Sequence, residues 1–218
     1  MLRIAKTKIR SERMDDSVTL TGIPIRQHAL GRRLQQALLN ENVLKASFRL
    51  KESQQETALA SANALMEGQG SGLFVRPART GKTIIFGGIS KALDERTLIL
   101  VPKKDLAGQT KEKLVDVVGF SPKDIGVIHS DVTEAERAQA LQSKVLITTY
   151  DSFRTLMKNG SVRGNEFPYV VLDEVHHAGG EETCPLIKEI LRQGAVVQGW
   201  TATDIFADGG NISDLLFN

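Results

Sequence analysis

The sequence predicts an α/β protein in which a mostly parallel sheet is covered by helices on both faces, giving three layers. Three observations favour this class. Short apolar runs rich in Val, Ile and Leu recur along the chain, helical patterns separate them, and polar clusters follow directly where the runs end. Ligands of such sheets bind beyond the carboxyl ends of the strands, so the polar clusters are the candidate functional segments.

Six segments are expected to be strands, because they are short, rich in Val, Ile and Leu, and separated by helical patterns. They are 72–76, 97–101, 125–129, 144–150, 169–174 and 195–203. Helices are expected between the strands, at 53–67, after the turn at 81–82, at 104–117, at 133–142, after Asp151, and where Leu186, Ile187, Ile190 and Leu191 form one apolar face.

Capping residues support several of these helices. Thr133 and Glu136 have the spacing of a capping box, and Asp151 is expected to cap the helix that follows it. Gly194 lies just past the end of the last of these helices, where glycine is favoured.

The first fifty residues differ from the rest in charge. They hold ten Lys/Arg and four Asp/Glu, which leaves eighteen and twenty-two of the totals of 28 and 26 for residues 51–218. Residues 1–22 are polar and poorly periodic, and 26–45 form a helical pattern. We expect 1–47 to be a short basic, partly helical N-terminal extension of a domain at 48–218. The extension is compatible both with binding a polyanion and with a solvated tail or surface helix.

Composition narrows the class of protein. The chain is 41% hydrophobic and 25% charged, as in ordinary soluble globular proteins. No apolar run is long enough to span a bilayer, and no secretory signal is recognisable. A lone cysteine, Cys184, excludes an intramolecular disulfide and suits a reducing compartment. We therefore expect a cytoplasmic protein, associated with the nucleoid if the source is a bacterium or phage, with no membrane partner.

A glycine-lysine turn follows the first strand, in "LFVRPARTGKTIIFGG". A strand that enters a tight turn and then a helix directs backbone N–H groups to one place, which suits phosphate. Lys82 adds an ammonium for the phosphates and Thr83 a hydroxyl for Mg²⁺. The pattern G-x-x-x-x-G-K-S/T is incomplete, however, because Arg76 stands where its first glycine belongs. A helix start with an incidental Lys-Thr is the alternative.

Two adjacent acids, Asp173 and Glu174, end the apolar run "YVVL". Acids there are costly without a cation, whereas Mg²⁺ bound by Asp173 and water activated by Glu174 would explain them. His176 and His177 with one distant cysteine make a poor zinc set. Because the two half-signals occur in the order typical of a P-loop NTPase, about ninety residues apart, we interpret the glycine-lysine turn as a P-loop.

The motifs together resemble the first RecA-like domain of superfamily-2 helicases and translocases, in the DEAH-like branch that includes restriction-enzyme motor subunits and excision-repair helicases. "PARTGKT" is similar to motif I, "LVPKKDLAGQ" to motif Ia, "LITTYDSF" to motif Ib, "DEVHH" to motif II and "TAT" to motif III. "LKESQQE" is similar to an upstream segment, and the ending "TATDIFADGGNISDLLFN" also follows the family. The resemblance covers about 48–218.

The resemblance implies a three-layer P-loop NTPase (RecA-like) domain that binds ATP and Mg²⁺. It implies a nucleic-acid-dependent ATPase, a helicase or translocase, that hydrolyses ATP to move on or remodel DNA or RNA, with DNA favoured. The alternative is a degenerate or truncated module that binds nucleotide or nucleic acid without its own catalytic cycle.

The resemblance also assigns roles to residues. Catalysis is assigned to Glu174, Lys82 and His176. Contacts with ATP are assigned to Gln54, at the adenine edge, and to Arg79, Thr80, Gly81, Lys82 and Thr83. Mg²⁺ is assigned to Thr83 and Asp173. Nucleic acid is assigned to Pro102, Lys103, Lys104, Thr148 and Thr149, and coupling between the sites to Thr201, Ala202 and Thr203.

Several features depart from the family pattern. Arg79 stands where motif I usually has glycine, Asp204 replaces a proline after "TAT", and Phe206 replaces an arginine. Motifs IV to VI, which belong to a second RecA-like domain, have no match in residues 1–218. We therefore expect a second RecA-like domain, in cis or in trans, to be needed for full activity; the chain is either an N-terminal fragment or a half-motor.

Overall fold

A single parallel sheet forms the centre of the molecule. The structure, a computed structural model, describes residues 23–39, 50–203, 205 and 209–217, with the side chains of the first helix described from 29 to 38. The six strands run in the order β1-β6-β5-β2-β4-β3, and every neighbouring pair is parallel. Their bounds are β1 Gly72–Val75, β2 Thr97–Val101, β3 Ile125–Ile128, β4 Val145–Thr149, β5 Tyr169–Asp173 and β6 Val196–Thr201.

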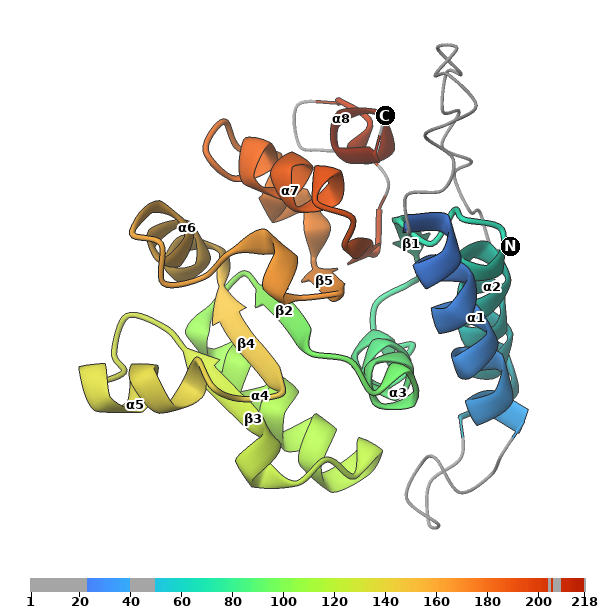
Figure 1. The fold of residues 1–218 in the computed structure, drawn as a ribbon, viewed down its shortest axis with the longest axis horizontal. Helices are drawn as coiled ribbons and strands as arrows, with labels where there is room; N and C mark the ends of the chain where they lie inside the picture. The colour runs from blue at the N-terminus through green and yellow to red at the C-terminus, as the bar shows by residue number, and fades with distance from the viewer. Residues whose placement is uncertain (1–22, 40–49, 204, 206–208, 218) are drawn as a thin grey trace.

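Helices cover both faces of the sheet (Figure 1). Their bounds are α1 Ile23–Leu39, α2 Glu52–Met66, α3 Lys82–Leu93, α4 Lys104–Lys113, α5 Glu134–Ala140, α6 Tyr150–Lys158, α7 Thr183–Arg192 and α8 Ile212–Phe217. A π-helical turn, Leu114–Val118, continues α4, and short 3-10 segments lie at Pro122–Asp124, Gly164–Glu166 and Val175–Gly179. The three-layer α/β prediction is therefore confirmed.

The strands alternate between two hydrophobic cores because successive side chains of a strand point to opposite faces. In β2, Ile99 packs in the core beneath α1–α4, whereas Leu98 and Leu100 pack in the core beneath α6–α8. Since both faces are buried, the strands read as continuous apolar runs and not as alternating patterns. Within the described residues, no helix is long and apolar enough to cross a membrane.

Helix α1 shares the core of the domain. Leu30 and Leu34 are buried against it, and a Cβ at Gly31 would meet atoms of Met66 in α2 at 2.7 Å. Arg33 donates to the Leu93 carbonyl and pairs with Glu95, so that this basic side chain contacts the domain itself. The described helix spans Ile23–Leu39; the remainder of the expected helical pattern, 40–45, and the expected polar segment 1–22 lie outside the described residues.

Two capping predictions had different outcomes. The capping box of Thr133 and Glu136 is present at the start of α5. The prediction that Asp151 caps α6 is wrong: Thr149 is the N-cap, and its hydroxyl accepts from the N–H of Ser152 at 3.2 Å. The helix begins two residues earlier than expected because Thr149 supplies the cap as the strand ends, which places Asp151 in the first turn.

Candidate functional site

Three loops meet at the carboxyl edge of one half of the sheet. Because β6 lies between β1 and β5, the turn after β1, the segment after β6 and the acid pair after β5 are neighbours. Lys82 Nζ lies 3.0 Å from Glu174 Oε1, so the two predicted half-signals touch. Lys82 is only 9% exposed, whereas the Glu174 side chain is 31% exposed, so the ion pair joins a buried ammonium to a half-buried carboxylate.

The turn between β1 and α3 has an unusual backbone. Arg79 and Gly81 have φ values of 63° and 80°, in the left-handed region. A Cβ at Gly81 would lie 2.4 Å from Gln54 Nε2 and would displace that amide, and the left-handed conformation itself favours glycine. Arg79 adopts the left-handed conformation at a cost of about 1–2 kcal/mol, and its side chain is exposed. The turn therefore keeps the shape that glycine would give it.

Gln54 braces this turn from the start of α2. Its Oε1 accepts from the Lys51 N–H at 3.0 Å, and its Nε2 donates to the Thr80 carbonyl at 3.1 Å. An amide has two donor hydrogens and two acceptor sites, so half of the capacity of this one is used inside the protein. Gln54 thus holds the turn in place.

The acid pair is held in a strained geometry. Asp173 ends β5 and is 8% exposed, whereas Glu174 is half-buried with φ 46°. The N–H of Glu174 donates to Asp173 Oδ1 at 3.1 Å. Burial, followed by the neighbouring Glu174, raises the pKa of Asp173 to about 6 against the opposing effect of Lys82. Strained residues of this kind are concentrated at functional sites.

The residues of this site fit Mg²⁺. One ammonium lies near two carboxylates, which leaves a local excess of negative charge; after burial, repulsion from Glu174 is the second cause of the raised pKa of Asp173. Carboxylate and hydroxyl oxygens are the ligands that Mg²⁺ prefers. Asp173, with Thr83 in the first turn of α3, offers both kinds.

Replacing Asp173 with Asn should stabilise the metal-free domain at pH 8. The pKa of Asp173 is about 6 in the folded state and lies above its ordinary value of 3.8, so the folded state favours the protonated acid. The free energy of unfolding is therefore highest below pH 3.8, and this contribution is lost as the pH rises through 6. That difference of about two pKa units corresponds to a cost on the order of 3 kcal/mol at pH 8, which the neutral amide avoids. Urea unfolding in EDTA should show the gain at pH 8 and little of it at pH 4; an equal gain at both pH values would contradict this.

His176 connects the acid pair with the segment after β6. Its Nδ1 lies 3.4 Å from Thr201 Oγ1, and this hydroxyl also accepts from the Thr203 N–H at 3.2 Å. Thr201 is buried, whereas Ala202 and Thr203 are exposed. A movement of the acid pair would therefore displace the segment after β6, and a movement of that segment would displace the acid pair.

The predicted nucleic-acid residues lie at the neighbouring half of the same edge. Strands β2 and β4 pair there, with Val101 opposite Thr149, so Pro102, Lys103 and Lys104 lie beside the start of α6. Lys103 and Lys104 are exposed, and Lys104 Nζ lies 2.6 Å from Asp131 Oδ2. That carboxylate raises the pKa of Lys104.

Thr148 requires a correction. Its side chain is 0% exposed, and its hydroxyl donates to the Thr149 carbonyl at 3.4 Å. Because side chains of a strand alternate, Thr148 lies on the same face of the sheet as Leu146, in the core beneath α6–α8, so its side chain does not reach a ligand at the surface. Thr149 is 8% exposed, and its hydroxyl is the cap of α6.

Three contacts of the site, made by Tyr150 and Arg76, were missed by reasoning from the sequence. The Tyr150 hydroxyl donates to the Asp173 carbonyl at 3.0 Å, and Arg76 donates to the Ser53 carbonyl at 2.8 Å and to Thr57 Oγ1. Arg76 stands where the longer P-loop pattern would have glycine, and it ties the end of β1 to α2. The motifs carry no signal for these contacts, because each joins segments that are distant in the chain.

A parallel sheet that presents such a turn and acid pair at one edge, after two strands that flank a third, is a P-loop NTPase domain, of the RecA-like type that superfamily-2 helicases use as their first domain. Within that class, the chain belongs to the family described as type III restriction enzyme, res subunit, which matches residues 47–205.

Individual relatives support this assignment. The chain is 36% identical over 114 residues to the DNA 3'-5' helicase Rad25 of Haloarcula marismortui, which covers 50% of this chain and 16% of that protein. It is 33% identical over 110 residues to the DNA 3'-5' translocase XPB2 of Sulfurisphaera tokodaii, and this match covers 50% of this chain and 22% of that protein. The Hef helicase domain of Pyrococcus furiosus superposes with a TM-score of 0.57 and 25% identity over 66% of this chain and 31% of that one. The chain thus spans about a fifth of the length of the two helicase relatives.

Proposed function

We propose that this domain binds ATP and Mg²⁺ as part of a nucleic-acid-dependent ATPase that moves on or remodels nucleic acid, DNA in preference to RNA. The observation that carries the proposal is the contact of Lys82 with Glu174, which brings the phosphate-binding turn and the acid pair into one site. The relatives described as a DNA helicase and a DNA translocase support the choice of nucleic acid.

The turn and α3 bind the triphosphate in this proposal. The first N–H groups of α3 lack acceptors within the helix and carry the positive end of its dipole. Lys82 adds its ammonium, while Gly81 and Thr80 shape the loop and Arg79 lies at its exposed side. Thr83 and Asp173 would hold Mg²⁺, which supplies charge stabilisation of the phosphates when bound.

Glu174 is the proposed general base, and Lys82 controls its availability. In the structure Glu174 Oε1 accepts from Lys82 Nζ, so the carboxylate is neutralised. Phosphate oxygens compete for the same ammonium, because they carry more negative charge than one carboxylate. Binding of ATP would therefore free Glu174 to orient a water molecule and accept its proton. Through its contact with Thr201, His176 would transmit the movement of Glu174 to the proposed coupling segment, Thr201, Ala202 and Thr203.

The strand-tracking surface is proposed to contain Pro102, Lys103, Lys104 and the start of α6 at Thr149. Exposed lysines and helix N-termini contact phosphates and sugars and not base edges, so binding should tolerate any sequence. A second RecA-like domain, in cis or in trans, would face this one and complete both sites.

Replacing Lys104 with Ala should weaken binding to single-stranded DNA and reduce its dependence on salt. One phosphate contact fewer lowers the slope of log affinity against log salt by about 0.7 for single strands. Fluorescence anisotropy with oligo(dT) at several salt concentrations measures this slope. Lys144 is a matched control, because it is also paired with an aspartate, Asp94, but lies at the other end of β4. The assignment fails if both variants change the slope equally.

The function itself is tested by phosphate release with and without nucleic acid, using the domain joined to a second RecA-like domain. We expect turnover that nucleic acid stimulates and that Glu174→Gln removes. A module without its own cycle, the alternative that Arg79 in the phosphate-binding turn favours, would bind nucleotide under the same conditions with no release of phosphate.

A further inference from the structure

Helix α6 is bonded to the acid pair by a buried tyrosine. Tyr150 is the first residue of α6, directly after the proposed nucleic-acid position at Thr149. It is buried, and its hydroxyl donates to the Asp173 carbonyl at 3.0 Å. Burial raises the pKa of this hydroxyl well above its usual range, so it stays a proton donor at every physiological pH.

The bond fixes the peptide that joins Asp173 to Glu174. The carbonyl of this peptide accepts from Tyr150, and its N–H donates to Asp173 Oδ1 at 3.1 Å. Both ends of the peptide plane are therefore held. Because Glu174 has a φ of 46°, which an unsupported residue rarely adopts, its orientation depends on such contacts.

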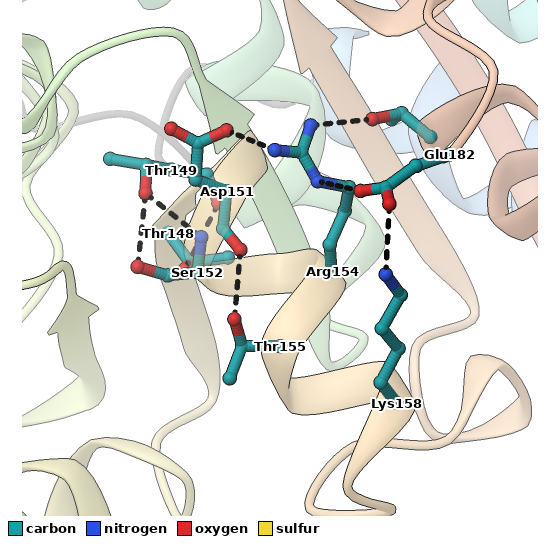
Figure 2. A network of polar contacts seen from close by, with 9 residues as sticks. Thr148, Thr149, Asp151, Ser152, Arg154, Thr155, Lys158 and Glu182 are labelled. Carbon is teal, nitrogen blue, oxygen red and sulfur yellow. Dashed lines mark hydrogen bonds and ion pairs between the residues drawn. The ribbon is translucent and has the colours of Figure 1, made fainter.

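A second set of contacts holds the C-terminal end of residues 174–182, the segment that begins at Glu174 (Figure 2). One turn further along α6, Arg154 donates to Asp151 at 2.6 Å and to the Thr183 hydroxyl at 3.2 Å. Its Nε lies 3.3 Å from Glu182, which also pairs with Lys158 at 3.2 Å.

Together, the contacts of Tyr150 and Arg154 hold both ends of residues 174–182. Glu182 and Thr183 begin α7, which follows the 3-10 segment Val175–Gly179. Residues 174–182 are thus attached to α6 at both ends, through Tyr150 before and Arg154 after.

We propose that α6 couples the nucleic-acid surface to the ATP site, with Tyr150 as a positioning residue for Asp173 and Glu174 and Arg154 as a second clamp on the same segment. The inference rests on the proposed function and names a connection for it. A ligand that moves the start of α6 moves Tyr150, and with it the peptide between the two acids. This connection differs from that of His176 and Thr201, since it acts on the backbone of the acid pair.

The first test removes single hydroxyls. Tyr150→Phe deletes the contact with Asp173, and Tyr169→Phe is the matched control: Tyr169 lies at the other end of β5, is fully buried, and donates to Gln198 Oε1 at 2.8 Å. Both variants should lose a hydrogen bond of similar strength and so lower Tm by about 2–4 °C. Affinity for a fluorescent ATP analogue is measured in Mg²⁺ and in EDTA. Tyr150→Phe should reduce the enhancement by Mg²⁺ at least threefold, whereas Tyr169→Phe should leave it unchanged.

The second test measures coupling between the two ligands. The analogue is titrated with and without saturating oligo(dT), and the ratio of the two affinities is compared across variants. Tyr150→Phe and Arg154→Gln should bring this ratio toward one. Arg192→Gln, which breaks the pair of Arg192 with Glu189 on α7, should retain the wild-type ratio.

The outcomes separate the inference from the function on which it rests. If the wild-type chain binds nucleotide and oligo(dT), and Tyr150→Phe keeps both the Mg²⁺ enhancement and the ratio, α6 is not the coupling element. If oligo(dT) leaves the affinity of the wild-type chain for the analogue unchanged, a ratio of one, the proposed coupling is overturned as well. If the wild-type chain binds neither ligand, the proposed function is wrong and this connection has nothing to couple.

Discussion

Joining residues 1–218 to a second RecA-like domain should raise ATP turnover by about 10³–10⁵-fold, the range that an arginine finger supplies in related chemistry. In the proposed site, Lys82, Thr83, Asp173 and Glu174 would all approach the triphosphate from one side. Phosphoryl transfer depends on charge stabilisation around the moving group, so a site filled from one side should bind Mg-ATP weakly and hydrolyse it near background.

Phosphate release by residues 1–218, with and without oligo(dT), measures the background. Robust stimulated turnover by these residues alone would contradict the prediction. Arg79→Gly would then identify the source of the charge, because glycine keeps the left-handed turn and removes only the guanidinium. A loss of that turnover in the variant would assign the role of the finger to Arg79.

Glu174→Gln should abolish hydrolysis in the two-domain protein while ATP binding stays close to wild type. The amide keeps the size of the side chain but accepts no proton, and loss of a general base costs about 10²–10⁴ in rate. Lys82→Ala should instead weaken binding itself, because it removes a buried ammonium from the phosphate site. Single-turnover phosphate release and equilibrium titration separate the two effects.

The ion pair of Lys82 with Glu174 also affects how the Glu174→Gln variant binds ATP. Glu174→Gln also removes the negative charge that pairs with Lys82 at 3.0 Å, so the variant is expected to bind ATP as tightly as wild type or more tightly. Equal losses of binding in Glu174→Gln and Lys82→Ala would show that the two roles have been assigned wrongly.

The sheet and most helices were predictable because their signals are local. Strand runs such as "TLILV" are buried on both faces and read as apolar segments, and the capping box at Thr133 identifies α5. The start of α6 was not predictable from composition. Thr149 and Asp151 are both good caps, and the choice between them depends on where β4 leaves the sheet.

The candidate site was partly predictable for the same reason. The motifs located the turn and the acid pair in the sequence, and the order of strands confirmed that they meet. The burial of Thr148 and the bond from Tyr150 to Asp173 depend on side-chain direction and on contacts between distant segments. A motif specifies neither of these, so they required the structure.

Equilibrium titration of residues 1–218 with a fluorescent ATP analogue in Mg²⁺ tests the central claim most directly, namely that the loops after β1 and β5 form one nucleotide site. Saturable binding at a single site is predicted, with competition by unlabelled ATP, weakening in EDTA and loss in Lys82→Ala. Absence of saturable binding, or an affinity that Lys82→Ala leaves unchanged, would contradict it.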